Sequence, residues 1–334
     1  MKAMVLQRTQ PIQGDPLIMI ELDDPRPKPG EVRIKVAACG ICHTDLHVIE
    51  GELPAKKLPL IPGHQIVGSV DAVGAGVTRF SPGDRAGIAW LHSTCGKCKF
   101  CLRGMENLCE SALFTGYDVD GGYAQYTVVP QSYAYPVPAQ FPDVEAAPLL
   151  CAGIIGFRAL RLSGADKNGP LGLFGFGASA HIVIQIARHQ GSDVFVFTRS
   201  EHHRQLATKL GAAWAGTAGE QPPAKLQSAI IFAPAGGLVL DALAVLEKGG
   251  TLALAGIYMT QVPPMDYREH LYWEKRIVSV ANSTRKDAED LLSVSAEIPV
   301  RTEVQEFQLH EANRALNLLK RGNIQGAGVL RLPA

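Results

Sequence analysis

Four of the seven cysteines stand close together in one short segment of the chain. They are spaced as CxxCxxCx7C, at Cys95, Cys98, Cys101 and Cys109. Four thiolates in one loop can surround Zn²⁺ tetrahedrally and leave no position for water or substrate, so the pattern predicts a structural zinc site. Four unrelated free thiols and an iron–sulfur cluster are the alternatives that the spacing alone leaves open.

A second set of potential metal ligands is dispersed along the chain. Cys39 and Cys42 lie in one Gly-containing turn, His64 follows Gly63 in another, and Cys151 lies in the segment PLLCAG. Catalytic zinc typically binds three protein ligands and leaves a fourth position open, and Cys, His, Cys is an established set. These residue types therefore indicate a catalytic zinc centre.

A glycine-rich turn follows the apolar segment LGLF. Gly175, Gly177 and Ala180 give the form GxGxxA at the beginning of a predicted helix. In dinucleotide-binding proteins the first glycine permits a tight turn, the second lets the pyrophosphate approach the backbone, and the small third residue lets helix and strand pack closely. The phosphates then lie at the helix N-terminus. The turn predicts a nicotinamide-dinucleotide site.

The next predicted strand ends in Thr198, Arg199 and Ser200. NAD enzymes place Asp or Glu at this point to bind the ribose hydroxyls. Asp193 lies at the beginning of the same strand, which is the wrong end for that role. Arginine and hydroxyl side chains suit a 2′-phosphate, so the sequence favours NADP(H) over NAD(H). The alternative is that Arg199 only stacks on the adenine and both cofactors bind.

The elements that must position these residues change character along the chain. As far as residue 147, short apolar runs such as EVRIKVAACG are broken by Gly and Pro, which predicts a mostly β domain. From Cys151 onward, strands alternate with helices, which predicts an α/β domain with a doubly wound parallel sheet. We expect strands at 171–174, 193–198, 228–234, 251–257 and 276–281, and helices at 178–190, 202–211 and 238–250.

The C-terminal segment contains two further predicted helices, at 287–297 and 310–322, and strands at 304–309 and 328–332. We expect it to return to the first domain, because the parallel sheet is complete by Ala281. The predicted domains are therefore residues 1–150 together with 285–334, and residues 151–284.

Bulk composition restricts the class of protein. The 334 residues include 32 acidic and 32 basic side chains, so no net charge favours nucleic acid or an anionic membrane as a partner. The N-terminus lacks the apolar stretch of a signal peptide, and no apolar run approaches the ~20 residues that a membrane-spanning helix needs. We expect a cytoplasmic protein, in which closely spaced thiols stay reduced and act as metal ligands.

Together these motifs resemble those of the zinc-containing alcohol dehydrogenases of the medium-chain dehydrogenase/reductase superfamily. The resemblance spans essentially the whole chain and rests on GICHTD, Gly63-His64, the four-cysteine loop, PLLCAG and the turn at Gly175, in that order. It implies a GroES-like, mostly β catalytic domain and a Rossmann domain, with two zinc ions per chain. By this resemblance, the ligands of the catalytic zinc are Cys42, His64 and Cys151.

The resemblance also implies roles for residues around the metal. Thr44 and His47 match a relay that carries a proton from the substrate through the cofactor ribose toward solvent. Asp45 matches a carboxylate that orients a ligand imidazole. His43 matches a position near the cofactor phosphates, and Gly256, in LAGI, matches a backbone contact to the nicotinamide carboxamide.

Three more residues near these positions need separate interpretation. Relatives mostly read GHE where this chain reads Gly63-His64-Gln65, and we expect the uncharged amide to impair ligand exchange at zinc without loss of the metal. Cys39 is the odd cysteine, expected to be a small buried residue. Trp90 matches an aromatic that narrows the alcohol pocket, with a core tryptophan as the alternative.

The sequence thus predicts a zinc-dependent oxidoreductase that interconverts alcohols with aldehydes or ketones by hydride transfer to or from NAD(P). Small to medium primary alcohols suit it best. The alternatives are a reductase of larger, cinnamyl-type aldehydes and a non-catalytic nicotinamide-nucleotide sensor on the same fold, although a sensor has no use for a proton relay. The family further suggests a homodimer or homotetramer.

Overall fold

The computed structural model describes residues 1–165, 169–298 and 300–333 and divides them into two compact units. Unit 1 comprises Met1–Cys151, Thr284–Ala296 and the chain from Arg301 onward. Unit 2 comprises the described residues of Ala152–Ser283 and Glu297–Val300. The chain therefore leaves unit 1 at Cys151 and re-enters it at Thr284.

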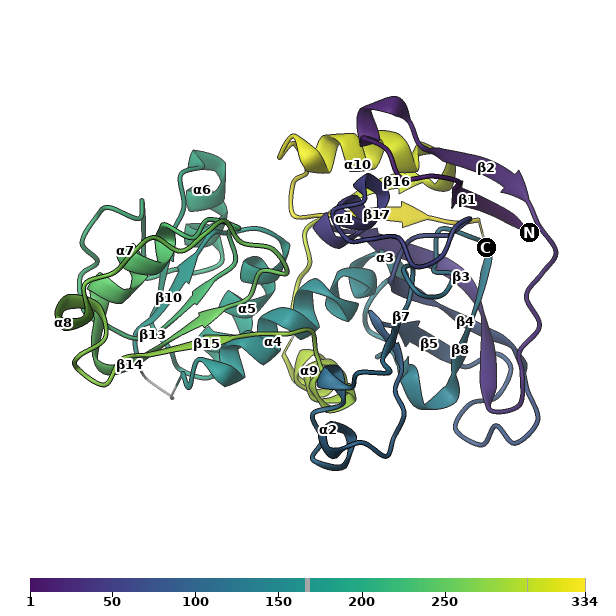
Figure 1. Cartoon of the computed structure of the whole chain (residues 1–334), viewed down its shortest axis with the longest axis horizontal. Coiled ribbons are helices and arrows are strands. Elements are labelled where there is room, and N and C mark those ends of the chain that lie inside the picture. The colour runs from purple at the N-terminus through teal and green to yellow at the C-terminus, as the bar shows by residue number, and fades with distance from the viewer. Residues whose placement is uncertain (166–168, 299, 334) are drawn as a thin grey trace. The chain divides into compact units, whose positions relative to one another are not determined.

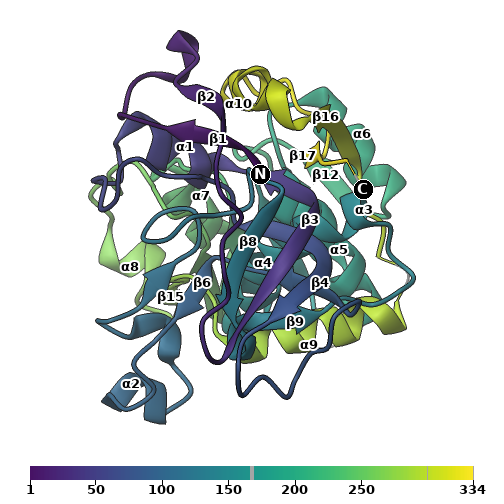
Figure 2. The ribbon, with the colours of Figure 1, turned by 90° about the vertical axis from the view of Figure 1, so that its right-hand side faces the viewer.

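The main sheet of unit 1 has seven strands among the described residues (Figure 2). At its centre are β3 (Glu31–Ile41) and β4 (Gln65–Val73), and buried residues alternate with half-buried ones along the first part of β3. β17 (Ala327–Arg331) pairs with β3, so the C-terminal segment belongs to this sheet. The other strands are β16 (Val304–Gln308), β5 (Arg85–Ile88), β9 (Ala134–Pro136) and β8 (Tyr126–Pro130).

Smaller elements surround this sheet. Two small antiparallel sheets pair β1 (Lys2–Leu6) with β2 (Leu17–Glu21) and β6 (Leu91–Ser93) with β7 (Leu113–Phe114). The helices of unit 1 are α1 (His43–Glu50), α2 (Lys99–Leu102), α3 (Asp143–Ala146), α9 (Arg285–Glu297) and α10 (Ala312–Lys320). Short 3₁₀ turns lie at η1 (Ile12–Gly14), η2 (Glu106–Leu108), η3 (Gln131–Tyr133), η4 (Ala147–Leu150) and η5 (Leu309–Glu311).

Within the described residues, unit 2 contains a parallel sheet of six strands. The first is β10 (Leu171–Phe174), whose four residues are all buried, as expected of a strand covered on both faces. In chain order the strands stand 3-2-1-4-5-6, the doubly wound order of dinucleotide-binding sheets. The others are β11 (Val194–Phe197), β12 (Trp214–Gly216), β13 (Leu226–Ile231), β14 (Leu246–Leu254) and β15 (Arg276–Ser279). Figure 1 labels β10, β13, β14 and β15 of this sheet.

Unit 2 contains two helices that were not predicted, at Ala152–Leu162 and Tyr267–His270, and one predicted helix is shorter than expected. The helices of this unit are α4 (Ala152–Leu162), α5 (Ala178–His189), α6 (Glu201–Lys209), α7 (Leu238–Val245) and α8 (Tyr267–His270). The helix predicted for 238–250 ends at Val245, because Leu246 is already extended and begins β14. The ammonium groups of Lys225 and Lys275 donate to carbonyls in the last turn of α7, which is how basic residues stabilise a helix C-terminus.

Each unit has its own apolar core. In unit 1 the core includes the central strand residues Ile34 and Ile66, and in unit 2 it lies between the sheet and α7, around Phe174 and Leu243. Within the described residues, no helix combines the length and the apolar character needed to cross a bilayer.

Candidate functional site

Three side chains of unit 1 converge where β3 ends and β4 begins. Pairing of β3 with β4 places Gly40 opposite Gln65, so Cys42 and His64 come to lie at the same edge of the sheet. The Nε2 atom of His64 lies 3.4 Å from Sγ of Cys42 and 3.3 Å from Sγ of Cys151, which follows η4. The three potential ligand atoms all lie within 4.8 Å of one another.

The turn before His64 depends on glycine. Gly63 has φ +93°, and a Cβ there would lie 2.3 Å from the ring of Tyr123, which is fully buried. The N–H groups of Gly122 and Tyr123 donate to the carbonyls of Gly63 and Pro62, at 2.9 and 3.0 Å. The backbone on both sides of this turn is therefore fixed, and with it the position of His64.

Asp45 connects the first ligand to the second. One carboxylate oxygen accepts from the backbone N–H of Cys42 at 2.8 Å, at the beginning of α1, and the other lies 3.2 Å from Nδ1 of His64. Asp45 is only 2% exposed. A carboxylate at Nδ1 orients the imidazole so that Nε2 faces the thiols, as in many carboxylate–histidine–zinc sites.

The electrostatics of the three-ligand cluster suit a cation. Burial lowers the pKa of His64, but the nearby groups Cys42 and Asp45 outweigh burial and raise it to about 10. The pKa of Cys42 is raised well above its ordinary value by a hydrogen bond with Cys151, by burial and by the charge of Cys151. Thiols and a carboxylate crowded into one buried place favour a positive ion among them, and the donor set fits Zn²⁺.

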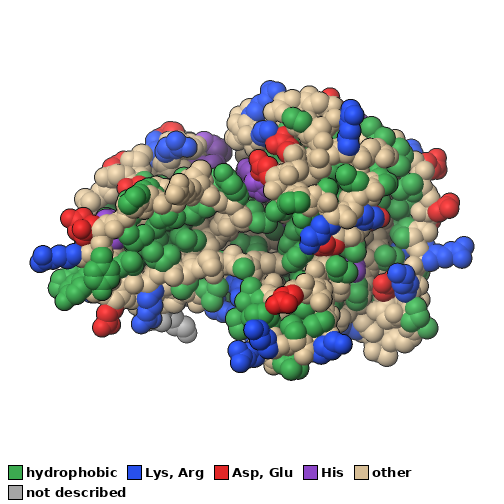
Figure 3. All heavy atoms as spheres, in the orientation of Figure 1, with side chains coloured by type: hydrophobic (Ala, Val, Ile, Leu, Met, Phe, Trp, Pro, Cys, Tyr) green, Lys and Arg blue, Asp and Glu red, His purple; other side chains and the backbone are tan. Residues whose placement is uncertain are grey.

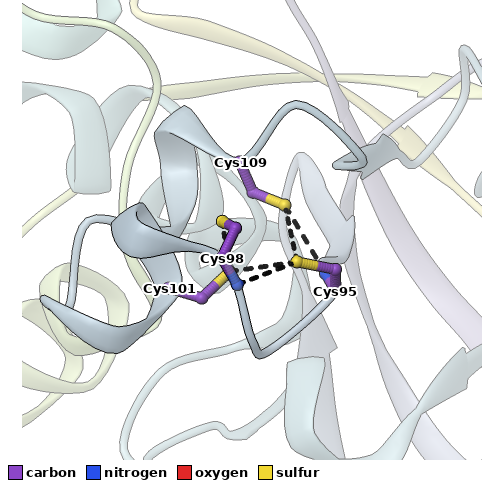
Figure 4. Close-up of side chains that lie close together, drawn as sticks. All are labelled: Cys95, Cys98, Cys101 and Cys109. Atoms are coloured by element: carbon purple, nitrogen blue, oxygen red, sulfur yellow. Dashed lines mark hydrogen bonds between the residues drawn. The ribbon is translucent and has the colours of Figure 1, made fainter.

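The four cysteines of the short loop also face one another (Figure 4). Sγ of Cys98 lies 3.5 Å from Sγ of Cys101, and Sγ of Cys109 lies 3.6 Å from Sγ of Cys95. Backbone N–H groups of Lys97 and Cys98 lower the pKa of Cys95 to about 6, which favours the thiolate form that binds metal. Four thiols with no open position match a structural zinc site.

Comparison with known proteins agrees with this geometry. Residues 28–139 match the alcohol dehydrogenase GroES-like domain, and residues 180–297 match the zinc-binding dehydrogenase family. A probable alcohol dehydrogenase of Mycobacterium tuberculosis is 48% identical over 99% of this chain and 97% of its own length. An alcohol dehydrogenase of Geobacillus stearothermophilus is 39% identical over 93% of this chain and 94% of its own length. The chain belongs to the zinc-dependent alcohol dehydrogenases.

Solved structures of the same family are similar to this chain. A cinnamyl alcohol dehydrogenase of Sorghum bicolor has a TM-score of 0.90 at 28% identity and covers 99% of this chain and 97% of its own. A CAD of Helicobacter pylori in complex with NADP(H) has a TM-score of 0.89 at 26% identity, with the same coverage. The predicted fold class, a GroES-like domain with a Rossmann domain, is thereby confirmed, as are the predicted zinc-dependent alcohol dehydrogenase activity and its zinc and NAD(P) cofactors.

The helix that follows Cys42 carries the other residues predicted near the metal of this alcohol dehydrogenase. Thr44 and His47 are one turn apart on α1, so their side chains share a face of the helix. Both are half-buried, whereas His43 is exposed. The imidazole of His47 contacts the carboxylate of Glu52, a residue that the sequence analysis did not single out.

Trp90 lies directly against the cluster of potential metal ligands. Its ring meets the ring of His64 edge to face, with centroids 4.8 Å apart. Phe114 and Tyr117 stack on Trp90, at 5.2 and 5.9 Å, and so restrict its orientation. Nothing in the sequence marked these two aromatic residues, because their role depends on the fold of the loop that contains them.

Gln65 and Cys39 are buried beside the ligands. Gln65 is 2% exposed and packs against Gly40, where a Cβ would lie 2.9 Å from the side-chain carbonyl carbon of Gln65. Cys39 is fully buried and lies outside both cysteine clusters of the described residues. Burial raises the pKa of its thiol well above the ordinary value, so Cys39 is a neutral core residue.

The glycine turn of unit 2 lies at the carboxyl end of its strand. Gly175 follows β10 and donates its N–H to the carbonyl of Phe197 at 2.8 Å. No atom lies within 4 Å of a Cβ placed on Gly177, so the backbone before α5 is accessible to a ligand. Ala180 is fully buried within α5, and Gly256 follows the end of β14.

The end of β11 lies beside this turn. Thr198 is buried, Arg199 is exposed, and Ser200 accepts from the N–H of His203 as the N-cap of α6. Arg204 donates to the carbonyl oxygens of Thr198 and Arg199, at 2.9 and 3.2 Å, and pairs with Glu201. Asp193 lies at the opposite end of the strand, where its carbonyl accepts from Leu171.

Proposed function

We propose that this enzyme interconverts primary alcohols and aldehydes with NADP(H) at a zinc ion held by Cys42, His64 and Cys151. The observation that carries the proposal is the convergence of two thiols and one imidazole on a single point. These three residues would hold Zn²⁺, which would bind the substrate oxygen and make its hydroxyl group easier to deprotonate. We assign residues 1–150 with 285–334 to the catalytic domain and residues 151–284 to cofactor binding.

The protein's own groups then have distinct tasks. Asp45 holds the imidazole of His64 through Nδ1. The hydroxyl of Thr44 accepts the proton of the substrate alcohol as it gives up its own, and His47, one turn further along α1, carries the released proton toward solvent. The ring of Trp90, fixed by its aromatic neighbours, forms a flat wall beside the metal that favours unbranched and planar substrates over branched ones.

The end of β11 supports NADP(H) as the preferred cofactor. It presents Thr198, Arg199 and Ser200, and the carboxylate that follows them, Glu201, is already paired with Arg204. The adenosine 2′-phosphate would therefore meet an exposed guanidinium without an unpaired negative charge beside it. The structurally similar CAD of Helicobacter pylori was solved with NADP(H), in line with this assignment.

Initial rates with a panel of alcohols and aldehydes test the proposal. We expect a higher kcat/KM with NADPH than with NADH, and we expect Arg199→Ala to lower kcat/KM for NADPH by about 10- to 100-fold, since a charge-assisted bond contributes about 1.5–3 kcal/mol. The same variant with NADH is the control and should change little, because that cofactor lacks the phosphate. A wild-type preference for NADH would contradict the assignment.

A second candidate function is reduction of larger, cinnamyl-type aldehydes. It is favoured by similarity to a cinnamyl alcohol dehydrogenase of Arabidopsis thaliana, 30% identical over 88% of this chain and 86% of its own length, and by the aromatic wall at Trp90. The same panel of substrates separates the two candidates. If the second candidate is right, kcat/KM will be higher for cinnamaldehyde than for short aliphatic aldehydes.

We also propose a homodimer or homotetramer in the cytoplasm, where the free thiols of both clusters stay reduced. β15 forms an edge of its sheet, and hydrophobic side chains gather nearby over the end of unit 2 that carries α8 (Figure 3). Large exposed apolar patches mark interfaces. The exposed aromatic side chains of α8 and of the residues that follow it are Tyr267, Tyr272 and Trp273.

Light scattering coupled to size-exclusion chromatography measures the subunit number. We expect a dimer or tetramer for the wild type and a smaller species for Tyr267→Asp, because Tyr267 is 65% exposed and a charge there opposes burial in an interface. Leu102→Asp is the control, since Leu102 is equally apolar and 75% exposed but belongs to α2 of unit 1 and not to the proposed interface on unit 2. A wild-type monomer would contradict the proposal.

A further inference from the structure

A buried carboxylate ties the four-cysteine loop to a helix that begins far along the chain. Glu106 lies in η2, between the third and fourth cysteines, and its side chain is 7% exposed. Its Oε1 atom accepts from the backbone N–H of Arg285 at 3.0 Å and from the guanidinium Nε at 3.2 Å. The two residues are 179 positions apart, so this attachment exists only in the folded chain.

The carboxylate of Glu106 lies at the N-terminus of α9. Arg285 is the first residue of this helix, so its backbone N–H has no acceptor within the helix. Glu106 supplies that acceptor, and its negative charge is favoured by the helix dipole. Thr284, where the chain re-enters unit 1, donates its N–H and its hydroxyl to Asp287 at 2.8 and 2.7 Å. The loop is therefore bonded to a helix start that has its own fixed structure.

Glu106 is also bonded to one of the four cysteines. The backbone N–H of Cys109 donates to the carbonyl of Glu106 at 3.1 Å and closes the turn of η2. A buried carboxylate that loses its cationic partner is strongly destabilised. Loss of the guanidinium of Arg285 would therefore favour movement of Glu106 toward water, and Cys109 would move with it.

A second contact leads from Arg285 toward another cysteine. The guanidinium lies over the ring of Tyr133, with Cζ 5.2 Å from the ring centroid. The hydroxyl oxygens of Tyr133 and Thr94 are 2.6 Å apart. A hydrogen bond from Thr94 lowers the pKa of the Cys101 thiol. Because each hydroxyl carries one hydrogen, Thr94 donates to Cys101 and Tyr133 donates to Thr94.

We propose that Arg285 is a positioning residue of the four-cysteine site: through Glu106 and Tyr133, it holds the loop in the form that retains zinc. Loop and helix then stabilise each other, because a coupling between two sites acts equally in both directions. Residues that support metal ligands from outside change metal affinity by about 10–100-fold. The inference is independent of the proposed activity, since four thiolates around one zinc leave no position for substrate.

Release of zinc from the holoenzyme to a chromogenic chelator tests the proposal. We expect two phases in the wild type, and the phase that leaves alcohol turnover intact belongs to the four-cysteine loop. Arg285→Met should accelerate this phase about tenfold and leave the other phase within about twofold. Methionine keeps the apolar part of the side chain and the backbone N–H, so the loss is confined to the contacts of the guanidinium.

Arg79→Met is the matched control. Arg79 pairs at 3.0 Å with Glu289, which lies one turn further along α9, and Arg79 is outside the four-cysteine loop. The same substitution thus removes an ion pair from the same helix, and both phases should stay within about twofold of wild type. Arg285→Lys should accelerate the loop phase only about threefold, because its ammonium group still attracts Glu106. Wild-type zinc release from Arg285→Met would overturn the proposal, even with a lower Tm.

Hydrogen exchange measures the same coupling from the side of the helix. In folded Cys109→Ser, which should lack the zinc of the loop, we expect amides of α9 to exchange about tenfold faster than in the wild type. The reference helix in unit 1 is α10, which bonds to η1 through Asn317 and should change by less than about twofold. If α9 kept its wild-type exchange, or if α10 changed as much as α9, the loop and α9 would not be specifically coupled and the proposal would be wrong.

Discussion

Replacement of Cys42 by serine is expected to abolish turnover in an enzyme that stays folded. A neutral hydroxyl is a poor substitute for thiolate as a zinc ligand, and only His64 and Cys151 would remain in the cluster. Zinc provides several kcal/mol of transition-state stabilisation, so its loss lowers kcat by a factor of at least ~10³. Metal analysis should find one zinc per chain instead of two.

Cys39→Ser is the matched control for this experiment. Cys39 lies three residues before Cys42, is fully buried, and belongs to neither cluster of potential ligands among the described residues. Its serine variant should keep two zinc ions and its turnover, with a modest loss of stability because a hydroxyl replaces a thiol in the core. Full activity and two zinc ions in Cys42→Ser would contradict the assignment of the metal centre.

The sequence was informative where residue type limits the chemistry. Four cysteines spaced as closely as Cys95, Cys98, Cys101 and Cys109 usually bind a metal ion. The glycine turn at Gly175, directly after an apolar strand, predicted the parallel sheet of a dinucleotide-binding domain. The alternation of strands and helices after Cys151 likewise predicted the α/β fold class. The three-residue strand β12 was not predicted, since a strand so short has no periodicity to detect.

Contacts across long sequence separations were beyond prediction. The carboxylate of Glu106, within the four-cysteine loop, accepts from the backbone and the guanidinium of Arg285, 179 residues later. The aromatic stack on Trp90 and the return of Glu52 to His47 also depend on how particular loops fold. In each case the residue types are common on protein surfaces, so only the fold reveals that they act together.

The four-cysteine loop is expected to stabilise unit 1 without taking part in turnover. Replacing Cys109 by serine leaves three thiolates, which opens the tetrahedral set and should release the structural zinc. Glu106 is buried and pairs with Arg285, the first residue of α9. If the loop became disordered, Arg285 would lose this partner and the beginning of α9 would lose a contact that holds it. We expect a loss of about 3–5 kcal/mol and a Tm lower by about 10 °C, measured by calorimetry.

The distinction between the two metal sites follows from comparing this variant with Cys42→Ser. Cys109→Ser should retain one zinc and, well below its Tm, most of its turnover, because Cys42, His64 and Cys151 are untouched. Leu102→Ala is the control within the same loop: Leu102 is 75% exposed, so its truncation should move the Tm by less than about 2 °C. If Cys109→Ser instead kept its stability and lost turnover at low temperature, the loop would act in catalysis and its assignment as a structural site would be wrong.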